Sequence, residues 1–212
     1  MATKFWGPLG WMTLHSISAI YPEQPTAEEK LILQKFMENF RESITCNHCK
    51  GHFTSMFNSY RNMHPEWNSS RFDFFLFICR AHNTVNKRLD KPVLPTLQAC
   101  IERLQEIEKV TPAASYRNAY ITYLINNWTR EGTGEALMFL GCAKTLLKIN
   151  NEYFSPRDSG FSSLRFIADA SVTDFIPEDP RRYNAGNNIP NAASFTPTMR
   201  IGLVGGVFRI RK

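Results

Sequence analysis

Apolar residues recur every three to four positions along most of the chain, which is the spacing of an amphipathic α-helix. The first such stripe runs over residues 8–20, and Tyr21-Pro22 ends it because the residue before a proline is disfavoured in helical backbone. Beyond Pro177 the chain is rich in Pro, Asn, Gly and Arg, and no regular element is predicted there. Further helices are predicted over residues 26–44, 46–60, 71–89, 97–110, 113–129, 133–149 and 162–175.

Start signals support several of these boundaries. Pro8 suits the first turn of its helix, where a missing N–H costs nothing. Thr26 with Glu29 three residues later is the pattern of a capping box. Thr111-Pro112 is typical of a new N-cap with proline at the first helical position, so we place a domain boundary here. The sequence therefore predicts an all-α protein with one domain over residues 1–110 and a second over 111–212, mainly helical to residue 175.

The composition is that of an ordinary globular chain. The 212 residues are 43% hydrophobic and 21% charged, which argues against the disordered and fibrous classes. The longest apolar runs are far shorter than the roughly 20 residues of a membrane-spanning helix, so no membrane span is expected. The formal net charge of +6 is spread along the chain rather than gathered in a stripe, and no nucleic-acid partner is expected.

A pair of cysteines carries the first chemical signal. Cys46 and Cys49 form a C-x-x-C at the start of a predicted helix, where free backbone N–H groups and the helix dipole favour a thiolate. Two sulfurs at this spacing form a disulfide readily, so the motif suits a dithiol that cycles between oxidised and reduced states. The chain has five cysteines, and this odd number leaves at least one thiol unpaired within it.

The same motif also ligates metals. Cys79 and His82 form a C-x-x-H, which together with Cys46 and Cys49 completes a Cys3His set of the kind that structural zinc sites use. The gap between the two pairs is longer than in zinc fingers, and both pairs fall on predicted helices rather than on turns. A zinc-stabilised helical binding module is therefore the alternative to a redox protein.

A polar patch on the predicted helix 71–89 indicates a bound ring. His82 and Asn86 are four residues apart, as are Asn83 and Lys87, so each pair shares one face of the helix. Buried imidazoles and amides are costly without partners, and a polar ring carrying phosphates supplies such partners. Each of these side chains taken singly is also compatible with an ordinary core or surface position.

Four motifs follow one another in the first half of the chain: Trp6-Gly7-Pro8-Leu9-Gly10-Trp11-Met12-Thr13-Leu14-His15, Tyr21-Pro22, Cys46-x-x-Cys49, and Cys79-x-x-His82-Asn83-x-Val85-Asn86-x-x-Leu89-x-Lys91-Pro92. These motifs and their order resemble those of the Erv/ALR family of FAD-dependent sulfhydryl oxidases. The additional C-terminal region resembles that of giant-virus members of the mimivirus type. The resemblance implies a four-helix bundle plus a short fifth helix that binds FAD in its mouth. The number of helices predicted over residues 1–110 agrees with that fold.

The resemblance also implies roles for individual residues. Cys46 takes electrons from an incoming dithiol, and Cys49 lies against the flavin ring and passes them to FAD. Protein or small dithiols are the implied substrates, and molecular oxygen is the implied acceptor, giving hydrogen peroxide. No metal ligand is implied. The implied FAD contacts are Gly7, Trp11, His15, Tyr21, Cys79, His82, Asn83, Val85, Asn86, Lys87, Leu89 and Lys91.

The other three cysteines have separate assignments. The resemblance implies a structural disulfide between Cys79 and Cys100. Cys142 has apolar neighbours, and we expect it to be a buried core thiol. The second, mobile cysteine pair that many members of the family carry is absent from this sequence.

Assembly and localisation are less closely defined by the sequence. A homodimer is expected, because bundles of this family pair through apolar helix faces. No secretory signal is visible at the N-terminus, and a viral member of the family would act in the host cytoplasm or the virion. Any other member would act in an oxidising compartment.

Overall fold

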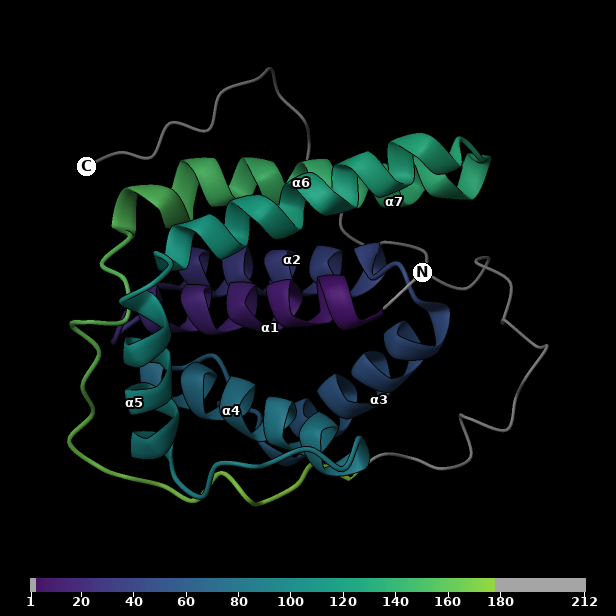
Figure 1. The fold of residues 1–212 in the computed structure, drawn as a ribbon. Coiled ribbons are helices and arrows are strands. Elements are labelled where there is room, and N and C mark those ends of the chain that lie inside the picture. Colours follow the sequence, from purple (N-terminus) through teal and green to yellow (C-terminus); the bar gives the residue numbers. More distant parts are fainter. Residues whose placement is uncertain (1–2, 178–212) are drawn as a thin grey trace. The chain divides into compact units, whose positions relative to one another are not determined.

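The computed structural model describes residues 3–177, and the irregular tail predicted beyond residue 177 lies outside the described residues. Within the described part the chain is all-α, as predicted, and the β pairing there is a single bridge between Thr96 and Ser171. A π-helix, Asn150–Phe154, and a 3-10 turn, Ser155–Arg157, follow the last α-helix. The α-helices, drawn in Figure 1, are α1 (Thr3–Ile20), α2 (Ala27–Ser43), α3 (Asn47–Met63), α4 (Arg71–Arg88), α5 (Leu97–Glu108), α6 (Ala113–Glu131) and α7 (Gly134–Ile149).

The starts of the helices confirm one predicted signal and correct two. The capping box at α2 is present, since Glu29 donates its backbone N–H to Thr26 Oγ1 over 3.2 Å and its carboxylate accepts the Thr26 N–H over 2.9 Å. Helix α1 begins at Thr3, so Pro8 lies inside it rather than in its first turn. Helix α6 begins at Ala113 with Pro112 as its N-cap, because the extended ψ of 143° at Pro112 keeps that residue out of the helix.

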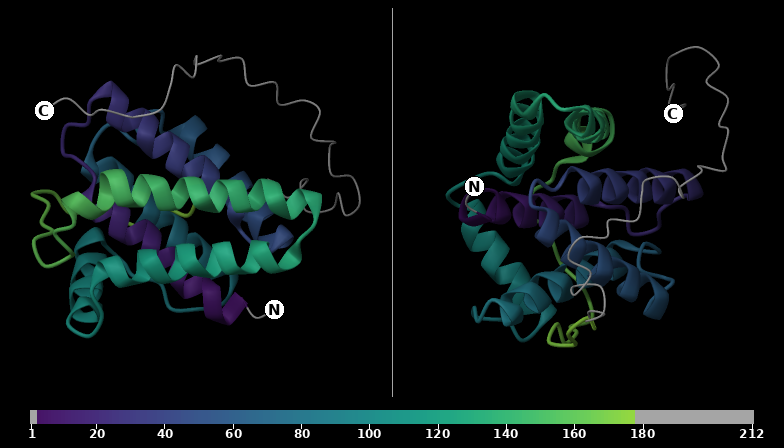
Figure 2. Two further views of the ribbon diagram at one scale, coloured as in Figure 1. Left: turned by 90° about the horizontal axis from the view of Figure 1, so that it is seen from above. Right: turned by 90° about the vertical axis from the view of Figure 1, so that its right-hand side faces the viewer.

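The seven α-helices of residues 3–177 pack in three layers. Helices α6 and α7 run antiparallel and cover α1 and α2, while α3, α4 and α5 lie on the other side of α1 (Figure 1 and Figure 2). A close approach between α1 and α6 depends on Gly10, because a Cβ there would lie 3.3 Å from the ring of Tyr120. Ring contacts of Phe40 with Tyr120 and of Phe36 with Phe154 join α2 to the C-terminal half.

The C-terminal half therefore shares a hydrophobic core with the N-terminal half. Tyr120, Ile121 and Leu124 of α6 are buried in one cluster with Leu14 and Ile17 of α1. Contacts group the described residues into one compact unit. The domain boundary at residue 110 stays a prediction about the modules of the sequence.

The helix predicted over residues 162–175 is wrong. This segment is irregular, with turns and bends, and it lies along α4 and α5, where Phe161, Leu164 and Val172 are buried. Its backbone is paired outside itself, since Leu97 N–H donates to the carbonyl of Ala170 over 2.9 Å. These tertiary contacts replace the bonds that a helix would make within the segment.

A buried arginine connects α6 to three other parts of the fold. The side chain of Arg117 is 1% exposed. Its guanidinium donates to Ser16 Oγ of α1, to Asn150 Oδ1 of the π-helix over 3.0 Å, and to the carboxylate of Asp158 over 2.9 Å. Every branch of the cation thus has an acceptor, which is the condition under which a buried charge is tolerated.

No helix among residues 3–177 is both long and apolar enough to cross a bilayer.

Candidate redox and cofactor site

A disulfide joins Cys46 and Cys49 at the start of α3. Cys46 is the N-cap residue, and its sulfur accepts the backbone N–H of Cys49 over 3.2 Å. The two Cα atoms are 5.2 Å apart, and both residues are half-buried. A sulfur held among free N–H groups at a helix start is stabilised as a thiolate when the disulfide opens. The predicted redox pair therefore has the placement that thiol–disulfide exchange requires.

A cation from α3 and an aromatic ring from α7 lie beside this disulfide. Lys50 directly follows Cys49, and its Nζ lies 3.7 Å from the centre of the Phe139 ring and 3.7 Å from the carboxylate of Glu42. Burial lowers the pKa of Lys50, and Glu42 opposes this shift. Sequence reasoning missed this group, because nothing in the pattern of α7 shows that Phe139 packs near a motif ninety residues earlier in the chain.

An aromatic path leads from α3 to the predicted cofactor residues. Phe53 lies one turn after Cys49, and its ring centre is 6.3 Å from that of Trp11. Trp11 in turn stacks on the ring of His82, with centres 4.6 Å apart and planes inclined by 6°. His82 Nδ1 lies 3.0 Å from His15 Nε2. The structure thus brings together Trp11, His15 and His82, which the sequence analysis placed in one site.

Both histidines of this cluster are held neutral. Burial and then the charge of Lys91 lower the pKa of His82 to about 4. Burial and then the neighbouring His82 lower the pKa of His15 well below its usual value. The Nδ1 atom of His15 is buried and has no hydrogen-bond partner among the described residues. A stacked ring pair beside an orphaned nitrogen fits a flat polar ligand, so the residues present are compatible with a flavin nucleotide.

The histidine cluster predicts a loss of stability in acid. The unfolded chain takes up protons near pH 6.5, whereas folded His82 resists protonation down to about pH 4, so the free energy of unfolding falls as the pH is lowered between these values. In His82→Gln this group is absent, so the free energy of unfolding should depend less on pH. Its fall over this range is expected to be smaller than that of the unsubstituted protein by up to about 3 kcal/mol. Urea unfolding at several pH values measures the difference, with His64→Gln at the end of α3 as control. Parallel profiles for His82→Gln and the unsubstituted protein would contradict this prediction.

A second group of the predicted FAD contacts lies at the end of α4 and in the turn that follows it. Leu89 N–H donates to the carbonyl of Val85 over 3.0 Å, and Lys91 N–H donates to that of Asn86 over 2.8 Å. Asp90 between them has a φ of 51°, in the left-handed region. This tight turn brings Lys91 back toward α4, which agrees with the effect of its charge on His82. Val85, Asn86, Leu89 and Lys91 are all at least partly exposed.

Other predicted contacts have partners of their own. The amide of Asn83 is buried and bonds the carbonyls of Leu94 and Val172 over 2.7 and 2.8 Å. The ammonium of Lys87 lies 3.9 Å from the centre of the Phe175 ring. Both residues thus hold the irregular segment that follows the 3-10 turn, part of which was predicted to be a helix.

Two further predicted contacts lie toward the ends of α1. Tyr21 follows the last residue of α1, and its hydroxyl donates to the carbonyl of Asn68 over 3.0 Å. Gly7 is near the start of α1, and a Cβ built on it meets no atom within 4 Å. Gly7 therefore leaves open space in front of the helix, whereas Tyr21 is fully buried.

The predicted disulfide between Cys79 and Cys100 is not formed in the structure. Both residues are free, buried thiols in the cluster between α4 and α5. Burial raises the pKa of Cys79 well above its usual value, as does a hydrogen bond with Cys100, so the two sulfurs are in contact. The two thiols are thus adjacent, and a disulfide between them stays a prediction.

The prediction for Cys142 also needs correction. This residue of α7 is half-buried rather than part of the core. Burial and then Glu42 raise the pKa of its thiol, while Lys50 opposes the shift. Cys142 therefore lies on the side of α7 that faces Glu42 and Lys50, closer to the redox disulfide than its apolar neighbours in sequence indicated.

The four ligands of the zinc alternative are not gathered around one point. Cys46 and Cys49 are bonded to each other, Cys79 contacts Cys100, and His82 contacts His15. Among residues 3–177, no group of three or more His, Cys, Asp or Glu side chains is arranged to hold a metal ion.

An all-α fold with a dithiol at a helix start, beside a stacked tryptophan and two neutral histidines, places the chain among helical dithiol proteins. Residues 9–106 match the Erv1 / Alr family. The FAD-linked sulfhydryl oxidase of an African swine fever virus isolate is 34% identical over 89 residues, which cover 42% of this chain and 71% of that protein. The chain belongs to the Erv1 / Alr family.

Relatives occur in other viruses and in plants. A probable FAD-linked sulfhydryl oxidase of Acanthamoeba polyphaga mimivirus is 29% identical over 121 residues, which cover 57% of this chain and 83% of that protein. The FAD-linked sulfhydryl oxidase ERV1 of Arabidopsis thaliana is 34% identical over 89 residues, 42% of this chain. The match spans 44% of the length of the Arabidopsis protein, so it covers less than half of that relative.

Proposed function

We propose that the chain is an FAD-dependent sulfhydryl oxidase that forms disulfides in protein or small dithiol substrates. The observation that carries the proposal is the disulfide between Cys46 and Cys49 at the start of α3, one helical turn from an aromatic path to Trp11 and His82. Membership of the Erv1 / Alr family, in which relatives are named FAD-linked sulfhydryl oxidases, supports it independently.

The thiol chemistry of this proposal uses the two sulfurs in order. A substrate thiolate attacks Cys46, which forms a mixed disulfide, and Cys49 leaves as a thiolate stabilised by the helix start. A second substrate thiolate then attacks the mixed disulfide, so the substrate leaves oxidised and Cys46 and Cys49 are reduced. Bound FAD supplies the acceptor for these two electrons, and molecular oxygen is the final oxidant, giving hydrogen peroxide.

Residues of α1 and α4 are proposed to hold the FAD. Trp11 and His82 provide a flat stacking surface, and the orphaned Nδ1 of His15 offers a polar contact. Lys91, which is exposed after the end of α4, is proposed to neutralise phosphate charge. The chain's own contribution is to place these groups and to keep both imidazoles neutral, so that each ring retains one nitrogen that can accept a hydrogen bond.

The association state is a separate proposal. A homodimer is proposed from the resemblance to the family, and its measurement is the molar mass in solution by light scattering. A mass equal to that of one chain at all concentrations would remove this proposal without affecting the chemistry.

The proposal that the chain binds FAD is tested by the visible absorption of the protein and by the release of FAD on denaturation. Purified protein is expected to show the visible absorption bands of a flavin and to release FAD, identified by chromatography, when it is denatured. Lys91→Glu is expected to weaken FAD binding about tenfold or more, since it replaces a phosphate-neutralising charge by a repulsive one. Lys109→Glu, an exposed lysine after α5, is the matched control. Colourless protein that releases zinc on acidification would support the zinc module instead.

A further inference from the structure

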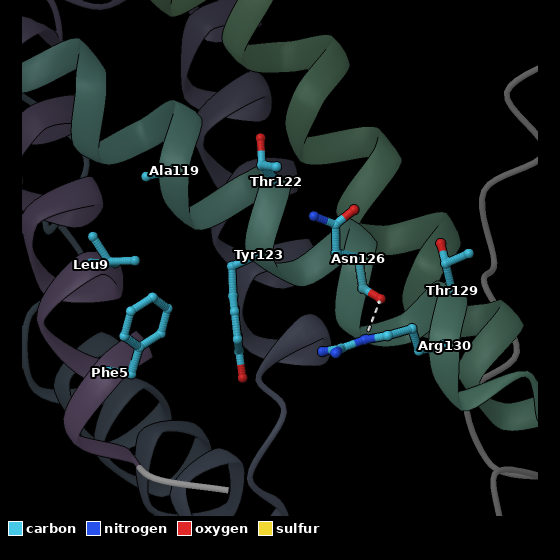
Figure 3. Close-up of a pocket in the computed structure, with 8 residues that line it drawn as sticks. All are labelled: Phe5, Leu9, Ala119, Thr122, Tyr123, Asn126, Thr129 and Arg130. Atoms are coloured by element: carbon cyan, nitrogen blue, oxygen red, sulfur yellow. Dashed lines mark hydrogen bonds between the residues drawn. The ribbon is translucent and has the colours of Figure 1, made fainter.

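A cavity lies between α1 and α6. Most of the residues that line it are outside residues 9–106, the segment that matches the family. The cavity has a volume of about 560 Å³, and Figure 3 shows the residues around it. That volume is in the range of sites that hold small ligands or parts of a peptide. The lining residues are Phe5 and Leu9 of α1, and Ala119, Thr122, Tyr123, Asn126, Thr129 and Arg130 of α6.

One end of this cavity is apolar and accessible. The side chain of Phe5 is 68% exposed, although it is a large aromatic residue. Its ring centre is 6.1 Å from that of Tyr123, and Leu9 lies one turn further along α1. An exposed aromatic side chain that borders a cavity is typical of a surface that another apolar group covers.

The other end carries an unneutralised cation. Arg130 lies on the other side of Tyr123 from Phe5 (Figure 3), and its Nε donates to the carbonyl of Asn126 over 3.3 Å. Among the described residues, no carboxylate lies within ion-pair distance of its guanidinium. The remaining N–H groups of the fork are therefore available, and a carboxylate is the partner that they fit best.

The cavity is connected to the redox disulfide through Tyr123. The hydroxyl of Tyr123 lies 3.3 Å from Thr45 Oγ1, and Thr45 directly precedes Cys46. Tyr123, Cys46 and Cys49 also pack against the same buried cluster. A ligand seated between Phe5 and Arg130 would thus lie next to the residue that precedes the sulfur proposed to receive the substrate thiolate.

We propose that this cavity, bounded by Phe5, Tyr123 and Arg130, binds an extended segment of a reduced protein substrate. An apolar side chain of that segment packs on Phe5 and Leu9, and an acidic side chain pairs with Arg130. The cysteine of the segment reaches Cys46 past Thr45. This inference rests on the proposed oxidase function and specifies its substrate class: dithiol proteins with an apolar and an acidic residue near the reactive cysteine.

The electron balance is that of the proposed exchange. The substrate thiol loses its proton to solvent, its sulfur bonds to Cys46, and the bond between Cys46 and Cys49 breaks. A second substrate thiol loses its proton and attacks the substrate sulfur that is bonded to Cys46, so the mixed disulfide breaks, Cys46 leaves as a thiolate and the substrate disulfide forms. Two protons reach solvent, and the two electrons remain on the reduced pair until FAD and oxygen remove them.

Binding is tested without turnover, so that its result is independent of the oxidase activity. The probe is a fluorescein-labelled peptide that carries leucine and aspartate, with serine in place of both cysteines, and a twin with lysine in place of aspartate. Fluorescence anisotropy is expected to show binding of the aspartate peptide to the full chain, and this binding should weaken about tenfold in Arg130→Glu and in Phe5→Ser. Arg130→Glu should bind the lysine twin more tightly than the unsubstituted protein does. Added salt should weaken the aspartate complex.

Two variants control for charge and for apolar surface. Arg103→Glu removes an exposed arginine of α5, and Leu31→Ser removes an exposed apolar side chain of α2. Both are expected to bind the aspartate peptide as the unsubstituted protein does. Equal weakening in Arg103→Glu, or no discrimination between the twin peptides, would overturn the proposal.

Rates of oxidation with two substrates distinguish a failure of the docking site from a failure of the proposed oxidase function. With the cysteine form of the peptide, Arg130→Glu is expected to raise KM about tenfold, while oxidation of dithiothreitol stays unchanged. An equal loss with both substrates would place the effect at the redox centre and overturn the docking site alone. Peptide binding without oxidation of any thiol would remove the oxidase function and retain the cavity as a peptide site.

Discussion

Cys49→Ser is expected to reduce thiol-dependent oxygen consumption by roughly a thousandfold or more, because it removes the leaving sulfur of the exchange. The variant retains Cys46, which can still be attacked by oxidants but has no partner with which to form a disulfide. Flavin content should be unchanged, since Cys49 is not among the residues proposed to hold FAD through stacking or charge. An oxygen electrode with dithiothreitol as substrate measures the effect, and absorption spectroscopy measures the retained flavin.

Cys142→Ser is the matched control for this experiment. Cys142 is a half-buried thiol on α7 near Lys50 and has no bonded partner. Its substitution is expected to leave turnover within about twofold, because no step of the proposed exchange passes through it. A large loss in Cys142→Ser, or normal turnover in Cys49→Ser, would contradict the assignment of the redox pair.

Arg117→Met is expected to be the most destabilising single substitution in the C-terminal half. The guanidinium is fully buried, and its three acceptors come from α1, the π-helix and Asp158. Methionine fills much of the volume but leaves the Asn150 amide oxygen and the Asp158 carboxylate without their donor. Breaking a buried pair from one side costs about 3–5 kcal/mol, and thermal unfolding measures the loss as a lower Tm.

Arg103→Met is the comparison variant for stability. Its guanidinium pairs with Glu106 three residues later, and both side chains are 63% exposed. Exposed pairs of this kind contribute little, so the expected change is within about 0.5 kcal/mol. Similar Tm values for Arg117→Met and the unsubstituted protein would mean that the buried network does not hold α6 to α1.

Most helices could be predicted because each has a local cause. The apolar stripe and the capping box of α2 lie within one stretch of sequence, so the start at Ala27 follows from neighbouring residues alone. The segment over residues 162–175 has the same kind of apolar spacing, yet it forms no helix. Its structure depends on Asn83 and Thr84 of α4, which bond the backbone at Val172 and Ile176, and no local pattern contains that information.

The residues of the candidate site also fall into those that the sequence could predict and those that depend on tertiary packing. Cys46 and Cys49 could be recognised because three residues fix their separation, and Trp11, His15 and His82 could be grouped through the resemblance to a family. Residues that reach the site from α6 and α7 carry no such signal. Phe139 beside Lys50 and Tyr123 beside Thr45 depend on how a later helical pair packs, and apolar spacing on those helices indicates only that one face is buried.

The shared core has a practical consequence for anyone who shortens the chain. A fragment that stops after α5 would retain every residue of the family match, but it would lose the rings that cover α2, namely Tyr120 against Phe40 and Phe154 against Phe36. It would also lose the indole of Trp128, which donates to the carbonyl of Ser43 over 2.9 Å just before the redox motif. Such a fragment would present a large apolar surface to water and precipitate during preparation, so expression should include the helical pair.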